Sequence, residues 1–262
     1  MDEILNVLGL QFDYAENSIP FYDKIKGHLE GINLEGVDLV CFPESCIYGF
    51  DYDVLSGAEE NDFEKQIGFF KEIAKQNDIN VIAGLVEKDG ENYFNTAMVF
   101  DREGKVLHKY RKNYLWAEEK KFFTPGSSYG VVELEGWKIG LGLCADLGFP
   151  EFSRSLALKG AEFLVFPSAW RGPYDRLWEL MLTARAAENQ AYVLGLNVLG
   201  SENNFCGNSV AVAPSGDVIK KLGKDEGFLS FELNKEDVFD RREEIGWLFM
   251  PRAEIYRKLG NG

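Results

Sequence analysis

Cysteine, histidine and proline are all scarce in this sequence. Its 262 residues include 4 cysteines, 2 histidines and 8 prolines. The cysteines are too few for a disulfide scaffold in a chain of this length, and they form no Cys-x-x-Cys pair. Neither His28 nor His108 stands at a spacing from cysteine that is typical of a zinc site. The sequence therefore predicts neither a disulfide framework nor a metal site.

The sequence also has few basic residues relative to acidic ones and no long apolar runs. Lys and Arg number 28 against 43 Asp and Glu, which gives a formal net charge of −15. Because nucleic acids are bound by clustered Lys and Arg, we expect no nucleic-acid partner. The segment "MDEILNVLGLQFD" carries acids where a signal peptide carries basic residues, and no apolar run approaches the roughly 18 to 20 residues of a membrane span. We therefore predict a cytoplasmic protein with no membrane partner.

Hydrophobic residues, in contrast, make up 45% of the chain, which is ample for one large core. Apolar runs at 4–12 and 37–45 predict strands, and apolar residues at helical spacing predict helices over 17–32 and 61–78. Strands and helices continue to alternate through the second half of the chain. This alternation predicts a single layered α/β domain spanning residues 1–262.

Three side chains with reactive chemistry stand at the ends of predicted strands. Glu44 follows one strand in "VCFPES", Lys112 ends "HKYRK", and Cys144 ends "WKIGLGLC". Layered α/β folds place their binding crevices at strand ends. Taken singly, each has a plainer interpretation: Glu44 and Lys112 as solvated charges, and Cys144 as a small buried side chain.

The three side chains together suit nucleophilic catalysis by a thiol. The thiolate is the reactive form, and a helix predicted to begin near Pro150 would stabilise that anion. A nearby lysine would stabilise both the thiolate and an oxyanion, and a buried glutamate with a raised pKa would accept the thiol proton. His28 lies among charges in a predicted helix and His108 lies in a strand, so a papain-like Cys–His pair fits poorly.

Further segments accompany these three in a characteristic order. The chain contains, from its N-terminal to its C-terminal end, "FPES", "YFNTAMVFD", "YRK", "CADLGFPE", "LTARAAENQAYVLGLN", "GNSVAVAPSGDVI" and "MPRAEIY". This series resembles the nitrilase superfamily of carbon–nitrogen hydrolases, on its amidase-like branch, over essentially the whole chain. The resemblance implies a four-layer αββα sandwich, a catalytic triad of Glu44, Lys112 and Cys144, and no cofactor.

The resemblance also implies a second glutamate seven residues after the lysine. That position is Glu119, and Glu118 is the alternative if the loop aligns differently. Glu119 is expected to position the substrate nitrogen or to support Lys112, while Glu44 carries protons. The backbone N–H of Ala145 is expected to hold the oxyanion together with Lys112.

Two aromatic residues are candidates for substrate binding. Tyr48 either lines the pocket or anchors the loop that carries the glutamate, and Trp170 either forms a pocket wall or packs in the core. The other cysteines, Cys41, Cys46 and Cys206, are predicted to be packing residues.

The predicted activity is that of a thiol amidohydrolase. It would cleave a small linear amide or N-carbamoyl compound through a cysteine thioester and release ammonia or an amine. An acyltransferase and a non-catalytic binding protein on the same fold are the alternatives. The tryptophan and acid that follow the nucleophile in true nitrilases are absent, which disfavours nitriles.

The residues after the nucleophile depart from the pattern of many relatives. Ala145 stands where they have tyrosine, and Gly148 stands where they have arginine. Absence of that arginine weakens an assignment to ω-amides of keto-dicarboxylates. The two small residues leave room for a bulkier acyl group unless a neighbouring side chain fills it.

The resemblance also implies pairing with a second subunit. The segment 240–262 is apolar and aromatic beyond the last predicted strand, and we predict that it forms homodimer contacts. The alternative is that it straps across its own subunit.

Overall fold

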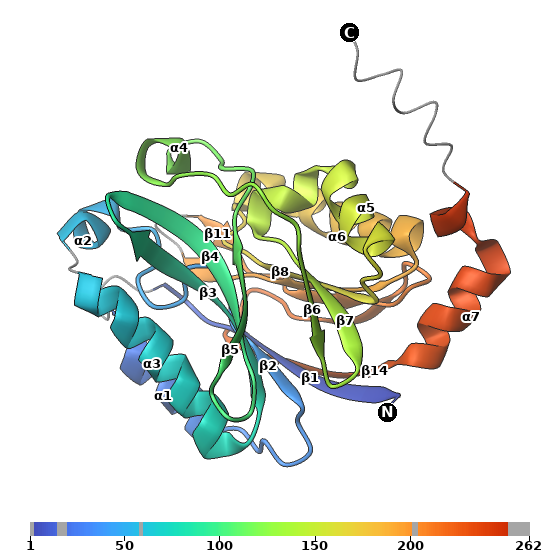
Figure 1. The fold of residues 1–262 in the computed structure, drawn as a ribbon, viewed down its shortest axis with the longest axis horizontal. Coiled ribbons are helices and arrows are strands. Elements are labelled where there is room, and N and C mark those ends of the chain that lie inside the picture. Colours follow the sequence, from blue (N-terminus) through green and yellow to red (C-terminus); the bar gives the residue numbers. More distant parts are fainter. Residues whose placement is uncertain (1–2, 15–19, 58–59, 201–203, 251–262) are drawn as a thin grey trace, which may run out of the picture.

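The structure, a computed structural model, describes residues 3–14, 20–57, 60–200 and 204–250. Two six-stranded sheets lie at its centre, with helices on both sides (Figure 1). Within the described residues, no helix is both long enough and apolar enough to cross a membrane.

The first sheet has the strand order β14-β1-β2-β3-β4-β5. Its strands are β1 (Ile4–Gln11), β2 (Leu39–Cys41), β3 (Asn80–Asp89), β4 (Asn92–Phe100), β5 (Val106–Arg111) and β14 (Gly227–Asn234). Strands β1, β2 and β3 are parallel, whereas β4 is antiparallel to both of its neighbours. Because two antiparallel steps cancel, β5 runs in the same direction as β2, and both strands end at the same edge.

The second sheet has the order β13-β12-β9-β8-β7-β6. Its strands are β6 (Gly130–Leu134), β7 (Trp137–Leu141), β8 (Phe163–Pro167), β9 (Tyr192–Leu196), β12 (Val210–Val212) and β13 (Val218–Lys221). Strands β7, β8 and β9 are parallel. A short ladder joins β10 (Leu199–Gly200) to β11 (Phe205–Cys206).

Helices cover the outer faces of both sheets. On the first sheet lie α1 (Tyr22–Glu30) and α3 (Glu60–Asn77), and on the second lie α5 (Pro150–Leu158) and α6 (Asp175–Asn189) (Figure 1). The remaining helical segments are α2 (Tyr52–Gly57), α4 (Glu119–Phe122), η2 (Cys144–Gly148), η3 (Gly172–Tyr174), α7 (Lys235–Ile245) and η4 (Trp247–Phe249). The helix predicted over 17–32 begins only at Tyr22, and positions 17–19 lie outside the described residues.

The alternation of side chains along β1 explains how the layers pack. Leu5 and Val7 belong to the core that includes the second sheet, whereas Leu8 and Leu10 pack with the α1 and α3 side. Gly9 faces the second sheet so closely that an added Cβ would lie 3.0 Å from a methyl carbon of Leu196. The central strands of each sheet are therefore buried on both faces, which confirms the four-layer αββα sandwich.

Candidate active site

Glu44 stands in a tight loop just after β2, and a glycine on the neighbouring strand makes that loop possible. A Cβ on Gly84 would lie 2.5 Å from the Cα of Glu44, closer than nonbonded atoms can approach. The amide of Cys46 donates to the carbonyl of Gly84 at 2.9 Å, and Ser45 adopts a positive φ of 47°. The Tyr14 hydroxyl donates to the Glu44 carbonyl oxygen. The backbone that carries Glu44 is therefore held on two sides.

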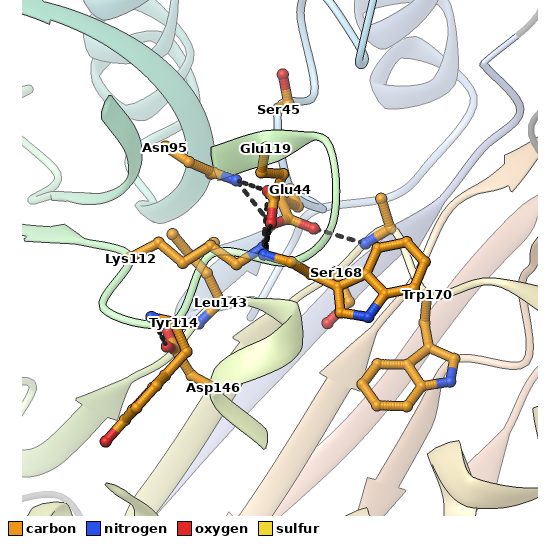
Figure 2. Close-up of polar contacts among 12 residues, drawn as sticks. Glu44, Ser45, Asn95, Lys112, Tyr114, Glu119, Leu143, Asp146, Ser168 and Trp170 are labelled. Carbon is orange, nitrogen blue, oxygen red and sulfur yellow. Dashed lines mark hydrogen bonds and ion pairs between the residues drawn. The ribbon is translucent and has the colours of Figure 1, made fainter. Parts of the chain in front are cut away.

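Lys112 follows β5, and its ammonium group contacts two carboxylates. Its Nζ lies 2.6 Å from Oε1 of Glu44, and 2.8 and 2.9 Å from the two carboxylate oxygens of Glu119. The Lys112 side chain is 1% exposed. Figure 2 shows this ammonium group between the two carboxylates, with the amide of Asn95 reaching the same oxygens. A buried lysine needs such compensation because it has lost its hydration.

Glu119, rather than its neighbour Glu118, meets the lysine. Its Oε2 also accepts from the backbone N–H of Trp116 at 2.8 Å, in the turn that begins the four-residue helix α4. The Glu118 side chain is 65% exposed and forms an ion pair with Lys121. The structure therefore brings Glu44, Lys112 and Glu119 together and leaves Glu118 at the surface.

Cys144 lies at a sharp turn between β7 and η2. Its φ is 40°, in the left-handed region that residues other than glycine seldom adopt. Two residues earlier, a Cβ on Gly142 would lie 2.4 Å from the ring of Phe166, so only glycine fits at that point. The turn carries Cys144 off the end of the strand toward the loops of the first sheet.

Asp146 holds this turn together from within. It is fully buried, and its carboxylate accepts from the backbone N–H of Leu143 at 2.8 Å, the hydroxyl of Tyr110 at 2.7 Å and the backbone N–H of Tyr114 at 3.0 Å. Figure 2 shows the contacts to Leu143 and Tyr114. Asp146 thereby ties the cysteine turn to the end of β5 and to the segment that leads to Glu119.

The surroundings of Cys144 favour its protonated thiol over the thiolate. Burial, and after it the Glu44 carboxylate, raise the pKa of the Cys144 thiol well above its ordinary value. Lys112 and the backbone N–H of Ala169 favour the thiolate, but they are outweighed. The helix predicted to begin near Pro150 is confirmed as α5, and because the pKa of the Cys144 thiol is raised in these surroundings, the thiol needs a base.

Glu44 and Lys112 have pKa values suited to complementary roles. Burial raises the pKa of the Glu44 carboxyl despite the opposing charge of Lys112. Burial alone would lower the pKa of Lys112, but the carboxylates of Glu44 and Glu119 hold it well above its ordinary value. Glu44 is thus a stronger proton acceptor than an exposed glutamate, and Lys112 stays charged.

Two connected cavities meet at Cys144. The polar chamber, of about 270 Å³, is lined by Glu44, Phe50, Tyr52, Lys112, Trp116, Ala117, Glu118, Glu119, Cys144, Ala169, Arg171 and Phe205. The apolar chamber, of about 280 Å³, is lined by Trp116, Cys144, Ala145, Gly148, Phe149, Ala169, Trp170, Arg171, Tyr174, Leu177 and Met181. Cys144 therefore borders both a chamber with acidic and basic groups and an apolar chamber.

Two of the three predicted substrate-binding residues line a chamber, and the third does not. Ala145 and Trp170 line the apolar chamber. Tyr48 lines neither chamber, because it is buried against the ring of Phe63, 6.3 Å away between ring centroids. This placement favours the alternative in which Tyr48 anchors the glutamate loop.

Three contributors to the site were missed at the level of sequence. Asn95 donates to Oε1 of Glu44 at 2.8 Å and to Oε1 of Glu119 at 3.0 Å, and Ala169 N–H donates to Oε2 of Glu44 at 2.8 Å. Arg171 lines both chambers. The segments "YFNTAMVFD" and "FPSAWR" were the available signals, but neither indicates that a backbone N–H on one sheet reaches a carboxylate on the other.

Metal ligation has no support in the described part of the chain, where no group of three or more His, Cys, Asp or Glu side chains is arranged to hold an ion. The acids of the polar chamber are instead occupied by Lys112, Asn95 and backbone N–H groups.

Comparison with known proteins places this site in context. A sequence profile of the carbon–nitrogen hydrolases matches residues 7–242. A 2-oxoglutaramate amidase from Bacillus subtilis is 31% identical over 224 residues, which cover 84% of this chain and 86% of that protein. Among solved structures, a carbon–nitrogen hydrolase from Helicobacter pylori is 25% identical with a TM-score of 0.91, and the match covers 99% of both chains.

A further solved structure shows a modified active site cysteine in a similar protein. A mutant of the amidase from Nesterenkonia sp. AN1 is 26% identical, with a TM-score of 0.87, over 97% of this chain and 99% of that one. It shows the result of Michael addition of acrylamide at the active site cysteine of that amidase.

Proposed function

The chain belongs to the carbon–nitrogen hydrolase family, and from this membership and the geometry around Cys144 we propose that it is a thiol amidohydrolase. Its substrate is a small linear amide or N-carbamoyl compound, and its products are an acid and ammonia or an amine. The observation that carries this proposal is the buried contact of Lys112 with Glu44 and Glu119 in the chamber that Cys144 also lines.

In the first step, Glu44 accepts the proton of the Cys144 thiol as Sγ attacks the carbonyl carbon of the amide. The C=O π electrons move onto the oxygen, and the ammonium of Lys112 and the backbone N–H of Ala145 stabilise the resulting oxyanion. The raised pKa of Glu44 supports its role as the base, since the thiol it must deprotonate also has a raised pKa.

In the second step, the oxyanion collapses and the C–N bond breaks. Glu44 returns its proton to the departing nitrogen, which leaves as ammonia or an amine, and a thioester remains on Cys144. A water molecule then gives a proton to Glu44 and attacks the thioester. Collapse of the second oxyanion breaks the C–S bond, and Glu44 returns the proton to sulfur. One carboxylate thus serves as base and acid in alternation.

Ammonia release across a panel of ω-amides, N-carbamoyl amines and aliphatic amides tests this function. We expect Cys144→Ala to abolish turnover, and Lys112→Ala to lower it by at least about 100-fold, since loss of one oxyanion donor typically costs 10²–10³. Ammonia release by the Cys144→Ala protein at the wild-type rate would end the proposal. Addition of hydroxylamine distinguishes an acyltransferase, which would form the hydroxamate in preference to the acid.

We also propose a cytoplasmic location and a homodimer. A reactive free thiol is preserved in a reducing compartment, and the four cysteines are unpaired. The predicted contact tail 240–262 is described only as far as residue 250, and that part carries strongly exposed apolar side chains: Trp247 is 54%, Phe249 74% and Met250 66% exposed. These residues support association with a second copy.

A further inference from the structure

The two chambers at Cys144 differ in which part of an amide they can hold. The carbonyl oxygen and the leaving nitrogen need Lys112 and Glu44, and both side chains line the polar chamber but not the apolar one. The remaining substituent of the carbonyl carbon must therefore leave Cys144 in the other direction. It enters the apolar chamber, which has room for several carbon atoms in about 280 Å³.

The depth of the apolar chamber depends on a residue that lacks a side chain. An added Cβ on Gly148 would have no atom within 4 Å, so no neighbouring side chain fills the space that this glycine leaves. Ala145, on the same turn, adds only a methyl group to the lining. The chamber is thus open at Gly148, where a larger residue would narrow it.

Apolar side chains make up most of the lining of this chamber. Among the described lining residues, the charged side chain is Arg171, which also lines the polar chamber. Its guanidinium carbon lies 5.4 Å from the ring centroid of Trp116 and 5.8 Å from that of Phe205. The lining residues confined to the apolar chamber include Phe149, Trp170, Tyr174, Leu177 and Met181.

We propose that the apolar chamber is the acyl-binding pocket, and that it selects primary amides whose acyl group is uncharged, apolar and bulky over amides that end in a carboxylate. This rests on the proposed amidase function. A carboxylate carried into the chamber would lose its water and would meet, among the described lining residues, one cation, Arg171, whose guanidinium lies over the rings of Trp116 and Phe205. An aliphatic group of the same shape would gain apolar burial against the rest of the lining.

The sharpest test uses two amides of equal shape. Succinamate and 4-methylpentanamide have the same chain, except that the terminal carboxylate of the first is an isopropyl group in the second. Binding is measured on the Cys144→Ala protein through tryptophan emission, since Trp116 and Trp170 line the chamber. We expect 4-methylpentanamide to bind at least about 10-fold more tightly, the lower end of what a well-formed apolar pocket achieves per methylene.

A glycine substitution then tests where the acyl group lies. Gly148→Leu, also made in the Cys144→Ala background, should weaken binding of 4-methylpentanamide at least about 10-fold and leave acetamide unchanged. The matched control is Gly27→Leu on α1, where an added Cβ likewise meets nothing within 4 Å, and it should change neither ligand. Unchanged binding of 4-methylpentanamide to Gly148→Leu would overturn the proposal.

A second variant keeps the test decisive if Gly148→Leu does not fold. Leu177 is 41% exposed on the first turn of α6, so Leu177→Arg can be accommodated and places a cation in the chamber. We expect it to reverse the preference in favour of succinamate. An unaltered preference would count against the assignment of this chamber.

The two proposals fail in different ways. If the protein binds succinamate tightly and still releases ammonia from amides, the assignment of the acyl-binding pocket is wrong and the amidase function stands. If the protein binds 4-methylpentanamide more tightly than succinamate but hydrolyses no amide, the pocket assignment stands and the amidase function is wrong. Binding and turnover are therefore both measured on the same set of amides.

Discussion

At the scale of single residues, the site depends on charges that are buried together. Lys112 and Glu44 are each 1% exposed, and neither would be tolerated there alone. The Lys112 ammonium makes three contacts with carboxylate oxygens. The Glu44 carboxylate accepts hydrogen bonds from Lys112, from the Asn95 amide and from the Ala169 N–H. Each group therefore compensates the lost hydration of the others, and removal of one leaves the rest unpaired.

The neighbouring glutamates provide a matched pair for testing this cluster. Glu119→Gln keeps the shape of the side chain but removes one of the two negative charges that contact Lys112. We expect kcat to fall by about 100-fold, within the range for loss of a positioned acid or base. Glu118→Gln removes an exposed carboxylate that lines the chamber without contacting Lys112, so it should lower kcat far less than Glu119→Gln. Equal effects of the two substitutions on ammonia release would exclude the assignment of Glu119.

The raised pKa of the buried Asp146 carboxyl predicts how the stability of the protein depends on pH. Burial raises the pKa of this carboxyl to about 6, although the N–H of Leu143 and the Tyr110 hydroxyl oppose the rise. An unfolded aspartate has a pKa of about 3.9, so between about pH 4 and 6 the folded chain holds more protons than the unfolded one. The contribution of Asp146 to the free energy of unfolding therefore falls as the pH rises through this window, by roughly 3 kcal/mol in total.

Comparison with Asp146→Asn isolates this effect, because the other titrating groups are common to both proteins. The stability of the wild type relative to the variant should decrease as the pH rises from about 4 to 6.5 and stay level above that. Urea unfolding at several pH values measures the difference. A difference that is constant with pH would mean that Asp146 keeps an ordinary pKa in the folded protein.

At the scale of elements, two features position the reactive groups. One is the sheet edge at which each strand ends, and the other is the presence of glycines where a loop packs closely against its neighbour. Glycines at 84 and 142 occupy positions at which a side chain would overlap the Glu44 backbone or the Phe166 ring. They allow the loop after β2 and the turn after β7 to lie close to their neighbours. Strand direction then brings the ends of β2 and β5 to one edge of the first sheet.

A single methyl group at position 84 tests this dependence on close approach. Gly84→Ala places a carbon 2.5 Å from the Cα of Glu44, so the loop must move. We expect a loss of about 1–3 kcal/mol in the free energy of unfolding, together with reduced ammonia release because Glu44 shifts relative to Lys112. Gly27→Ala on α1 is the control and should not destabilise the protein. Full activity and stability in Gly84→Ala would show that the loop is not constrained by this contact.

At the scale of the whole molecule, two sheets of six strands face each other, with helices outside them. The arrangement buries both faces of the central strands and brings loops from both sheets to the cysteine. Glu44 and Lys112 come from the first sheet, and Cys144 and Ala169 come from the second. Neither sheet alone carries the complete set of groups. The activity therefore depends on the packing of the two sheets against each other.

Assembly into a dimer predicts a further result at this scale. If the exposed C-terminal aromatics contact a second copy, the wild type should sediment as a homodimer. Phe249→Asp should then shift it toward the monomer, because a charge would be buried without a partner. Val54→Asp, at another exposed apolar residue, should leave the dimer intact. A monomeric wild type would remove the basis for assigning dimer contacts to this tail.

Much of the fold was predictable because its signals are local. The alternation of strands and helices and a helix beginning at Pro150 each follow from residues close together in the chain. The helix predicted over 17–32 instead begins at Tyr22, since helix ends depend on capping contacts that periodicity does not reveal. Recognition of the family rested on motif order, which needs no contact between distant residues.

The amino-acid sequence by itself determined which chemical groups are available: one thiol at a strand end, a lysine, and glutamates at positions 44, 118 and 119. Only the tertiary structure decided between Glu118 and Glu119, turned Tyr48 away from both chambers, and added Asn95 and the Ala169 N–H to the site. It also left the space beside Gly148 unfilled. The reason is physical: burial, pKa and hydrogen bonding depend on neighbours in space, and in this fold those neighbours come from opposite sheets.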